Sequence, residues 1–205
     1  MVKQERALRT REALIKSAAT VFDRDGFSVA SLTAISSLAG VSNGALHFHF
    51  ASKAGLADSV EEAAAERLDR IVTAHEGAVG NALQLLVNTS HDLARRLTED
   101  VVLRVGFELS RDQVREGGGR LYRQWHQWVE GALKRADCEG VLNEVTPEEV
   151  AASVVAATTG FEVLRTQDPE WLSHRTITRF WQLLLPRLAA ASVLGDLVAA
   201  GSRSR

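Results

Sequence analysis

Residues 31–56, SLTAISSLAGVSNGALHFHFASKAGL, contain two short apolar patterns separated by Gly40. Apolar residues recur at helical spacing on both sides of this glycine. They are Leu32, Ile35, Leu38, Ala45, Leu46 and Phe50. A glycine such as Gly40 can take a positive φ without a Cβ clash, and Ser42 is a candidate N-cap for the second helix. The stretch therefore predicts a helix-turn-helix that packs on a preceding helix.

The rest of the chain also predicts helices. Apolar side chains form one face over 8–25, and Gly26 ends that pattern. Ser52 is a candidate cap for a helix over 53–75, and Thr146 with Glu149 is a candidate capping box around Pro147. Further helices are expected near 79–97, 100–113, 119–137, 147–166 and 174–193, with a break at Gly117–Gly119 and a disordered tail at 201–205. No alternating strand pattern of useful length occurs, so the predicted fold class is all-α.

Composition narrows the class of protein. The 205 residues are 45% hydrophobic and 24% charged, as in soluble globular proteins. No apolar run approaches the roughly 18 residues of a membrane span, and the N-terminus lacks an apolar signal core. Cys138 is the single cysteine, which fits a reducing compartment. We expect a cytoplasmic protein with no membrane partner.

The net charge of −2 is unevenly distributed. Within 1–56, seven basic residues stand against four acidic ones, so this segment is basic and the remainder is acidic. The basic residues are Lys3, Arg6, Arg9, Arg11, Lys16, Arg24 and Lys53. A basic segment that contains a helix-turn-helix indicates a surface for a polyanion. An uneven distribution of surface charge without function is the alternative.

The second helix of the helix-turn-helix presents polar residues outward. Side chains at the start of such a helix meet base edges in the major groove, so we expect Asn43 and His47 to contact DNA. Gly44 permits close approach of the backbone, and Ser42 suits a phosphate oxygen. Arg6 and Lys53 add sequence-independent attraction. Phe50 is expected in the core.

Catalytic and metal-binding alternatives find little support. His47 and His49 are roughly 200° apart around a helix, so they do not share one metal ion. No Walker loop, dinucleotide-binding fingerprint, HExxH or G-x-S-x-G motif occurs. Ser90, His91 and Asp92 are adjacent, and a helix points them to different sides, which excludes a triad. We expect no enzyme activity, no metal site and no cofactor.

Several stretches resemble one protein family. AGVSNGALHFHFASKAGLA at 39–57 resembles the DNA-binding motif of TetR-family repressors. LYRQW at 121–125, AATTGFEVLR at 156–165 and FWQLLLPRLA at 180–189 resemble the C-terminal half of the γ-butyrolactone autoregulator receptors. The resemblance covers nearly the whole chain, and it implies an all-helical homodimer that a small molecule releases from its operator.

The resemblance also implies a domain organisation and site residues. It places a helix-turn-helix DNA-binding domain at 1–52 and a ligand-binding and dimerisation domain at 53–200. Thr33 and Lys53 match phosphate contacts, and 42–48, including Phe48, match the recognition helix. Asn43 and His47 stand where the family usually has Lys and Tyr, which predicts an altered base preference. SKAGL also lacks the common acidic pair after the Lys.

Aromatic residues dominate the expected ligand site. Trp125 and Thr159 match pocket positions of the receptors, although an aromatic stripe is more often core. The complete expected set is Phe107, Trp125, Trp128, Val155, Thr159 and Phe161. A mostly apolar cavity with one or two hydroxyl groups suits a lactone or an antibiotic-like amphiphile. Small residues over 147–166 and leucines over 174–193 are expected at the dimer interface; they are Ala151, Ala152, Val155, Ala156, Thr159, Leu183, Leu184 and Leu188.

The expected function is that of a ligand-responsive transcriptional repressor. Its partners are a palindromic double-stranded DNA operator, a small-molecule ligand and a second copy of the chain. The ligand is expected to be either a γ-butyrolactone-type signal or an antibiotic or biosynthetic intermediate. The regulated genes are expected to belong to secondary metabolism. A generic multidrug-responsive repressor of the same type and an α-helical enzyme are the alternatives.

Overall fold

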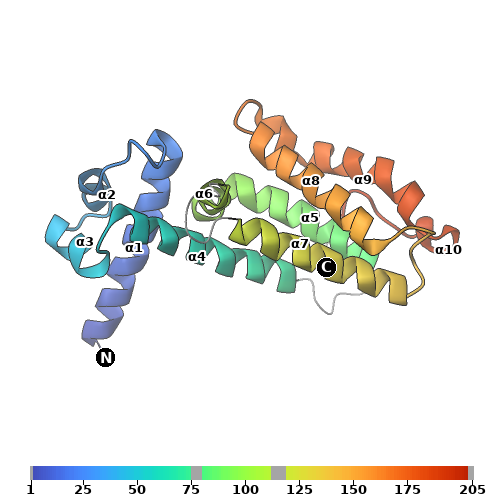
Figure 1. The fold of residues 1–205 in the computed structure, drawn as a ribbon, viewed down its shortest axis with the longest axis horizontal. Helices are drawn as coiled ribbons and strands as arrows, with labels where there is room; N and C mark the ends of the chain where they lie inside the picture. The colour runs from blue at the N-terminus through green and yellow to red at the C-terminus, as the bar shows by residue number, and fades with distance from the viewer. Residues whose placement is uncertain (1, 75–79, 112–118, 203–205) are drawn as a thin grey trace. The chain divides into compact units, whose positions relative to one another are not determined.

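The computed structural model describes residues 2–74, 80–111 and 119–202 (Figure 1). Every regular element in these ranges is helical, which confirms the predicted all-α class, and one isolated antiparallel bridge joins Leu142 to Ala189. The helices are α1 (Val2–Asp25), α2 (Leu32–Leu38), α3 (Asn43–His49), α4 (Lys53–Thr73), α5 (Ala82–Glu99), α6 (Val101–Ser110), α7 (Arg120–Cys138), α8 (Pro147–Leu164), η1 (Pro169–Leu172), α9 (His174–Leu188) and α10 (Ala191–Leu194).

Several predicted helix ends need correction. Helix α1 begins at Val2, before the apolar pattern over 8–25, so Arg6 also lies on this helix. Helix α9 ends at Leu188 because Ala189 adopts an extended conformation and pairs with Leu142. Thr146 is the N-cap of α8, but its hydroxyl donates to Glu149 Oε2 (2.5 Å) and no side chain caps the backbone. The predicted capping box therefore does not form. Gly117 and Gly118 lie outside the described residues.

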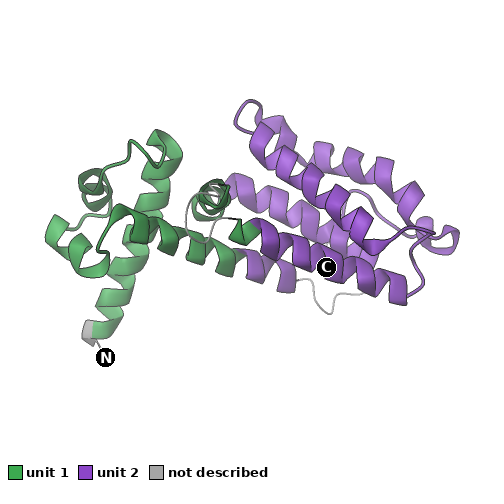
Figure 2. Cartoon of the chain, in the orientation of Figure 1, with its two compact units in different colours: residues 1–67, 100–121 green, residues 68–99, 122–205 purple. Residues whose placement is uncertain are grey.

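Packing divides the chain into two compact units (Figure 2). Unit 1 contains residues 1–67 and 100–121, and unit 2 contains residues 68–99 and 122–205. Helix α6 thus groups with the helix-turn-helix, although about 50 residues separate it from α3 in the sequence. The predicted boundary between residues 52 and 53 divides the chain by function, and it stays a prediction.

The core of unit 1 is shared by α1 and α6. On α1, Leu14, Ala18 and Phe22 are almost fully buried, and Ile35 and Leu46 pack on them from α2 and α3. The same apolar cluster includes three residues of α6, namely Val102, Val105 and Leu109. Because burial of apolar surface is the main stabilising contribution to folding, α6 is part of the core on which the helix-turn-helix rests.

Gly106 brings α6 close to α4. A Cβ atom at this position would lie 2.1 Å from Ala64 Cβ, which is far inside van der Waals contact. The absence of a side chain on Gly106 and the small side chain of Ala64 therefore set the distance between the two helix backbones.

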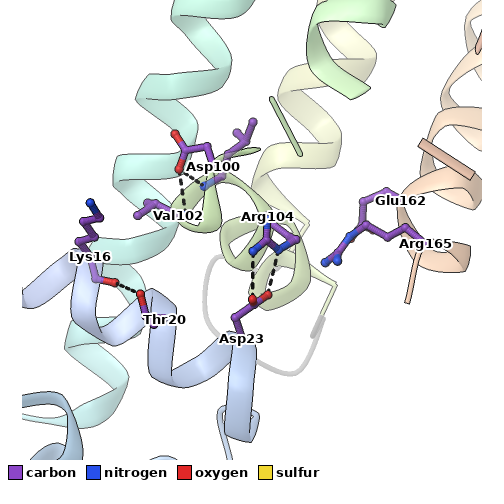
Figure 3. Close-up of polar contacts among 9 residues, drawn as sticks. Lys16, Thr20, Asp23, Asp100, Val102, Arg104, Glu162 and Arg165 are labelled. Atoms are coloured by element: carbon purple, nitrogen blue, oxygen red, sulfur yellow. Dashed lines mark hydrogen bonds and ion pairs between the residues drawn. The ribbon is translucent and has the colours of Figure 1, made fainter. Parts of the chain in front are cut away.

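Two ion pairs hold the N-terminal half of α6, and Figure 3 shows the first of them. Arg104 donates from Nε and Nη2 to the two carboxylate oxygens of Asp23, at 2.9 and 3.0 Å. Asp100 is the N-cap of α6, and its Oδ1 accepts from Val102 N (2.9 Å). Its other oxygen accepts from Arg67 Nε (2.9 Å). The bidentate pair fixes α6 to the last turn of α1, and the Asp100 pair fixes its start to α4.

The C-terminal segment of unit 2 is held by side chains of α5 and α9. Gln84 exchanges two hydrogen bonds with the backbone of Val198, and Asn88 exchanges two with Ser202. His91 Nε2 and His174 Nε2 contact the carbonyl oxygens of Ala199 (2.9 Å) and Ala200 (2.8 Å). The expectation of a disordered tail is therefore wrong for residues 201 and 202, and 203–205 lie outside the described residues.

The first prediction concerns the contact between α4 and α6. Gly106→Ala should lower the free energy of unfolding by about 1–3 kcal/mol because the added methyl group forces the helices apart. Gly131 on α7 is the matched control, since a Cβ atom there meets no atom within 4 Å. Gly131→Ala should raise the free energy of unfolding by roughly 0.5–1 kcal/mol through helix propensity alone. Urea unfolding followed by circular dichroism measures both, and equal effects would contradict the close approach.

The second prediction concerns pH. Burial lowers the pKa of His91, and the electrostatic effect of His174 lowers it further. The hydrogen bond to Ala199 O raises this pKa, but by less. A histidine with a lowered folded pKa stabilises the fold above its unfolded pKa of about 6.5, and this contribution is lost as the pH falls through the folded value. His91→Gln keeps an N–H donor that does not titrate. Its free energy of unfolding should therefore fall less between pH 7 and pH 5 than that of wild type, whereas His126→Gln should keep the wild-type slope.

Candidate functional site

Side-chain caps and a glycine turn define the helix-turn-helix. Ser31 Oγ accepts from Ala34 N (3.1 Å) and caps α2. Ser42 Oγ accepts from Ala45 N (3.1 Å) and caps α3, as predicted. Between the helices, Gly40 has a φ of +68°, and the amides of Gly40 and Val41 donate to carbonyls in the last turn of α2. This is a Schellman motif, which explains why a glycine occupies the turn.

Helix α3 separates a buried side from an exposed side. Leu46 and Phe50 are buried in the core of unit 1, as predicted. Four of the expected DNA-binding residues share the opposite, exposed side; they are Asn43, Gly44, His47 and Phe48. The Phe48 ring is 82% exposed and contacts the edge of the His49 ring at 5.2 Å. The exposed side of α3 thus combines polar side chains with one aromatic ring.

The Asn43 amide contacts helix α2. Its Oδ1 accepts from Ser36 Oγ (2.5 Å), and its Nδ2 lies 3.5 Å from Thr33 Oγ1. Sequence reasoning assigned Asn43 and Thr33 to DNA, and it did not find their contact with each other. Ser36 is buried and has no role in the sequence-based prediction. The Asn43 side chain therefore fixes α3 against α2, in addition to lying on the exposed side.

Lys53 also makes contacts within unit 1. Its Nζ donates to the carbonyl oxygens of Ser28 (2.9 Å) and Ala30 (3.0 Å) and lies 4.9 Å from the centre of the Phe27 ring. These contacts join the start of α4 to the segment between α1 and α2. Two of the three ammonium hydrogens are used in this way, which leaves one for a phosphate oxygen.

The basic residues of α1 differ in availability. Arg6 is exposed. Arg9 pairs with Glu5 (2.6 Å), and Arg11 donates to Ser59 Oγ (3.1 Å) and lies over the Phe50 ring. Arg6 is thus the arginine of this group whose described surroundings leave it most open to solvent.

The expected ligand-binding residues are distributed over both units. Phe107 is buried in unit 1, and the other five belong to unit 2. Trp125 is only 1% exposed and stacks on Trp128, with ring centres 5.2 Å apart and planes 16° apart. Phe161 contacts the rings of Trp171 and Phe180. The structure therefore brings Trp125 and Trp128 together and places Phe161 in a different aromatic cluster.

Helix α8 contacts Trp125 through Thr158, the residue before the expected Thr159. Trp125 Nε1 donates to Thr158 Oγ1 (2.9 Å), and Val155, Thr158 and Thr159 are all half-buried. One turn further on, Tyr122 OH donates to Glu162 Oε2 (3.0 Å), and Glu162 is only 2% exposed. The expected ligand-binding set does not include Tyr122, Thr158 or Glu162. Their spacing, i and i+3 on α7 and i and i+4 on α8, is the signal that relates them.

The residues of the expected dimer surface differ in their exposure. Ala152, Ala156 and Leu183 are exposed, and Leu183 is 79% exposed. Ala151 and Leu188 are instead buried within the chain, so these two residues of the expected interface pack internally.

Ser90, His91 and Asp92, which are adjacent in the sequence, form no catalytic arrangement. Ser90 Oγ donates to Leu86 O (2.8 Å), and His91 Nε2 contacts Ala199 O.

Comparison with known proteins identifies similar regulators. Residues 14–60 match the family described as bacterial regulatory proteins, tetR family. The A-factor receptor protein of Streptomyces griseus is 29% identical over 202 residues, which cover 96% of this chain and 70% of that protein. The transcriptional regulator TtgR of Pseudomonas putida is 27% identical over 168 residues, which cover 77% of this chain and 80% of the regulator.

Solved structures give the same result. The crystal structure of a gamma-butyrolactone receptor (ArpA-like protein) has a TM-score of 0.81 and 27% identity, and the alignment covers 95% of this chain and 96% of the receptor. CprB from Streptomyces coelicolor, solved in complex with its biological operator sequence, has a TM-score of 0.78 and 27% identity over 94% of each chain. The sequence-based resemblance is therefore confirmed.

The third prediction tests the contacts of Lys53. Lys53→Ala should lower the free energy of unfolding by about 1–2 kcal/mol, because it removes two hydrogen bonds from a charged donor and a cation–π contact. Lys16→Ala is the matched control, since Lys16 is exposed on α1. Its effect should stay within about 0.5 kcal/mol. Equal stability of the two variants, measured by urea unfolding, would show that the Lys53 contacts do not stabilise the fold.

Proposed function

We propose that this chain, which is a transcriptional regulator of the TetR family with homology to gamma-butyrolactone receptors, is a repressor that a small apolar ligand releases from its operator. The observation that carries the proposal is the exposed side of α3. Asn43, Gly44, His47 and Phe48 lie there together, while the other side of the helix is fixed in the core of unit 1.

The four exposed residues have complementary chemistry for a major groove. The His47 ring offers a donor and an acceptor for base edges, and the Phe48 ring suits the methyl group of thymine. Gly44 has only Ser42 Oγ near its Cβ direction, at 3.8 Å, so a DNA backbone or base could approach closely. The contacts with Ser36 and Thr33 use part of the hydrogen-bonding capacity of the Asn43 amide. In this proposal Asn43 contacts a base with the remaining capacity. Arg6, Thr33, Ser42 and Lys53 supply phosphate contacts in this proposal.

The ligand site is proposed around Trp125 and Trp128. The other members of the expected set in unit 2 are Val155, Thr159 and Phe161, and the contacts of α7 with α8 add Tyr122, Thr158 and Glu162. The Trp128 Nε1 atom is buried without a hydrogen-bond partner among the described residues, which supports a ligand that carries an acceptor such as a lactone carbonyl. The stacked indoles supply a flat apolar surface for the rest of the molecule.

A homodimer completes the proposal. A palindromic operator has two half-sites, so two copies of α3 are needed. The exposed Leu183, with Ala152 and Ala156, supports an interface built from α8 and α9 because the small residues allow close helix approach.

No helix in the described ranges has the length and apolarity to cross a membrane. We propose a cytoplasmic site of action.

The fourth prediction tests DNA binding and release. Fluorescence anisotropy with DNA from upstream of the chain's own gene should detect binding that weakens steeply between low and high salt. A synthetic γ-butyrolactone should reverse that binding. Absence of specific binding, both to this DNA and to sites selected from random sequence, would refute the proposal. Release by an extract of the producing culture, but not by the lactone, would assign a different ligand.

Two variants separate the roles within this experiment. His47→Ala should weaken operator binding by about 1–3 kcal/mol and affect scrambled DNA much less, whereas His126→Ala on α7 should bind like wild type. Trp125 is fully buried, and Trp125→Phe therefore retains most of the packing that Trp125→Ala would remove. Trp125→Phe should bind DNA normally and respond to the ligand more weakly. An unchanged response would remove Trp125 from the ligand site.

A further inference from the structure

Unit 2 contains a pocket that none of the six expected ligand-binding residues lines. Its volume is about 720 Å³, within the roughly 300–1,000 Å³ of small-molecule sites. It lies between α5, η1 and the start of α9, with Ala74 at the end of α4 on its wall. Ala94, Leu172 and Pro169 contribute apolar surface. A mostly apolar pocket with a few polar groups is the usual form of a ligand site.

Two histidines line the pocket, and each has one ring nitrogen that can accept a hydrogen bond. The His91 and His174 rings lie with their centres 4.6 Å apart, and both line the pocket. Each Nε2 contacts a carbonyl oxygen, which only accepts, so each Nε2 carries the hydrogen. In the neutral rings Nδ1 is then the acceptor. Of the two Nδ1 atoms, that of His174 also lies 3.5 Å from Thr178 Oγ1.

The charges of the lining favour a cation. Arg95 is its one basic side chain apart from the histidines, and it pairs with Asp92 and with Glu99 (2.5 Å) on the same helix. Glu170 lies across from them on η1, and its carboxylate has no hydrogen bond or ion pair among the described residues. The lining therefore has three carboxylates and one guanidinium, and Glu170 is the carboxylate that Arg95 does not pair with. The complement of such a lining is a donor with a positive charge.

We propose that this pocket is a second ligand site, which binds a small apolar molecule that carries a protonated amine. The apolar part lies against Ala94, Pro169 and Leu172, and the amine pairs with Glu170. The site goes beyond the proposed function because it uses other residues than the Trp125 site. It is also joined to the C-terminal segment, since His91 and His174 hold Ala199 and Ala200.

Isothermal titration calorimetry of the full chain without DNA tests this site. Three probes differ only in the end group: 4-phenylbutylamine, 4-phenylbutanol and 4-phenylbutanoate. The amine should bind about tenfold or more tightly than the alcohol, as expected for one charge-assisted contact, and the carboxylate should bind weakest. Equal affinities of amine and alcohol, or tighter binding of the carboxylate, would overturn the proposal.

Charge-neutralising variants locate the amine. Glu170 is exposed, so the Glu170→Gln variant should fold normally. This variant should bind the amine about tenfold more weakly than wild type and bind the alcohol with unchanged affinity. Glu144→Gln is the control, because Glu144 is an exposed carboxylate outside the lining. Amine titration should also shift the NMR signals of the His91 and His174 rings, which His91→Gln and His174→Gln assign. Binding that is unaffected by Glu170→Gln and leaves these signals unmoved would place the amine elsewhere. None of these readouts depends on DNA binding, so the outcome is independent of the repressor proposal.

Discussion

The distance between α4 and α6 is the constraint on which the rest of unit 1 depends. Gly106 permits an approach that no other residue type allows, because a Cβ atom would overlap Ala64 Cβ. At that distance Val102, Val105 and Leu109 reach the apolar face of α1, and Arg104 reaches Asp23. The helix-turn-helix packs on the same face of α1. The contact between α4 and α6 therefore supports the same core on which α2 and α3 pack.

Polar side chains in and beside the helix-turn-helix also position its helices within unit 1. Asn43 joins α3 to Ser36, and Lys53 joins α4 to the carbonyls of Ser28 and Ala30. Residues at such positions are easily assigned to DNA because they are polar and lie near the recognition helix. Here the same side chains orient that helix before any DNA is bound. His47 and Phe48 remain as the side chains of α3 most directly available to a partner.

Much of this organisation could be predicted from the sequence, and the limits have physical causes. Apolar periodicity, Ser42 and Gly40 identify the helix-turn-helix because caps and turns depend on neighbouring residues. Periodicity does not report which helices pack together, so the place of α6 in unit 1 was not predicted. The resemblance implies Thr159 for the ligand site, but it does not report hydrogen bonds, so the contact of Trp125 with Thr158 follows only from the structure. The pocket beside His91 and His174 depends on residues more than 80 positions apart, and no local pattern signals it.

The sharing of one core by α1 and α6 has a consequence for how such regulators are recombined. Residues 1–52 are the obvious segment to graft onto another sensor, because they contain the whole helix-turn-helix. Such a hybrid would leave the apolar face of α1 facing a helix that did not evolve with it. The transferable piece is discontinuous, and it includes 100–121 together with the N-terminal helices. Exchange of DNA specificity between relatives is therefore easier by changing the exposed side of α3 than by moving the domain.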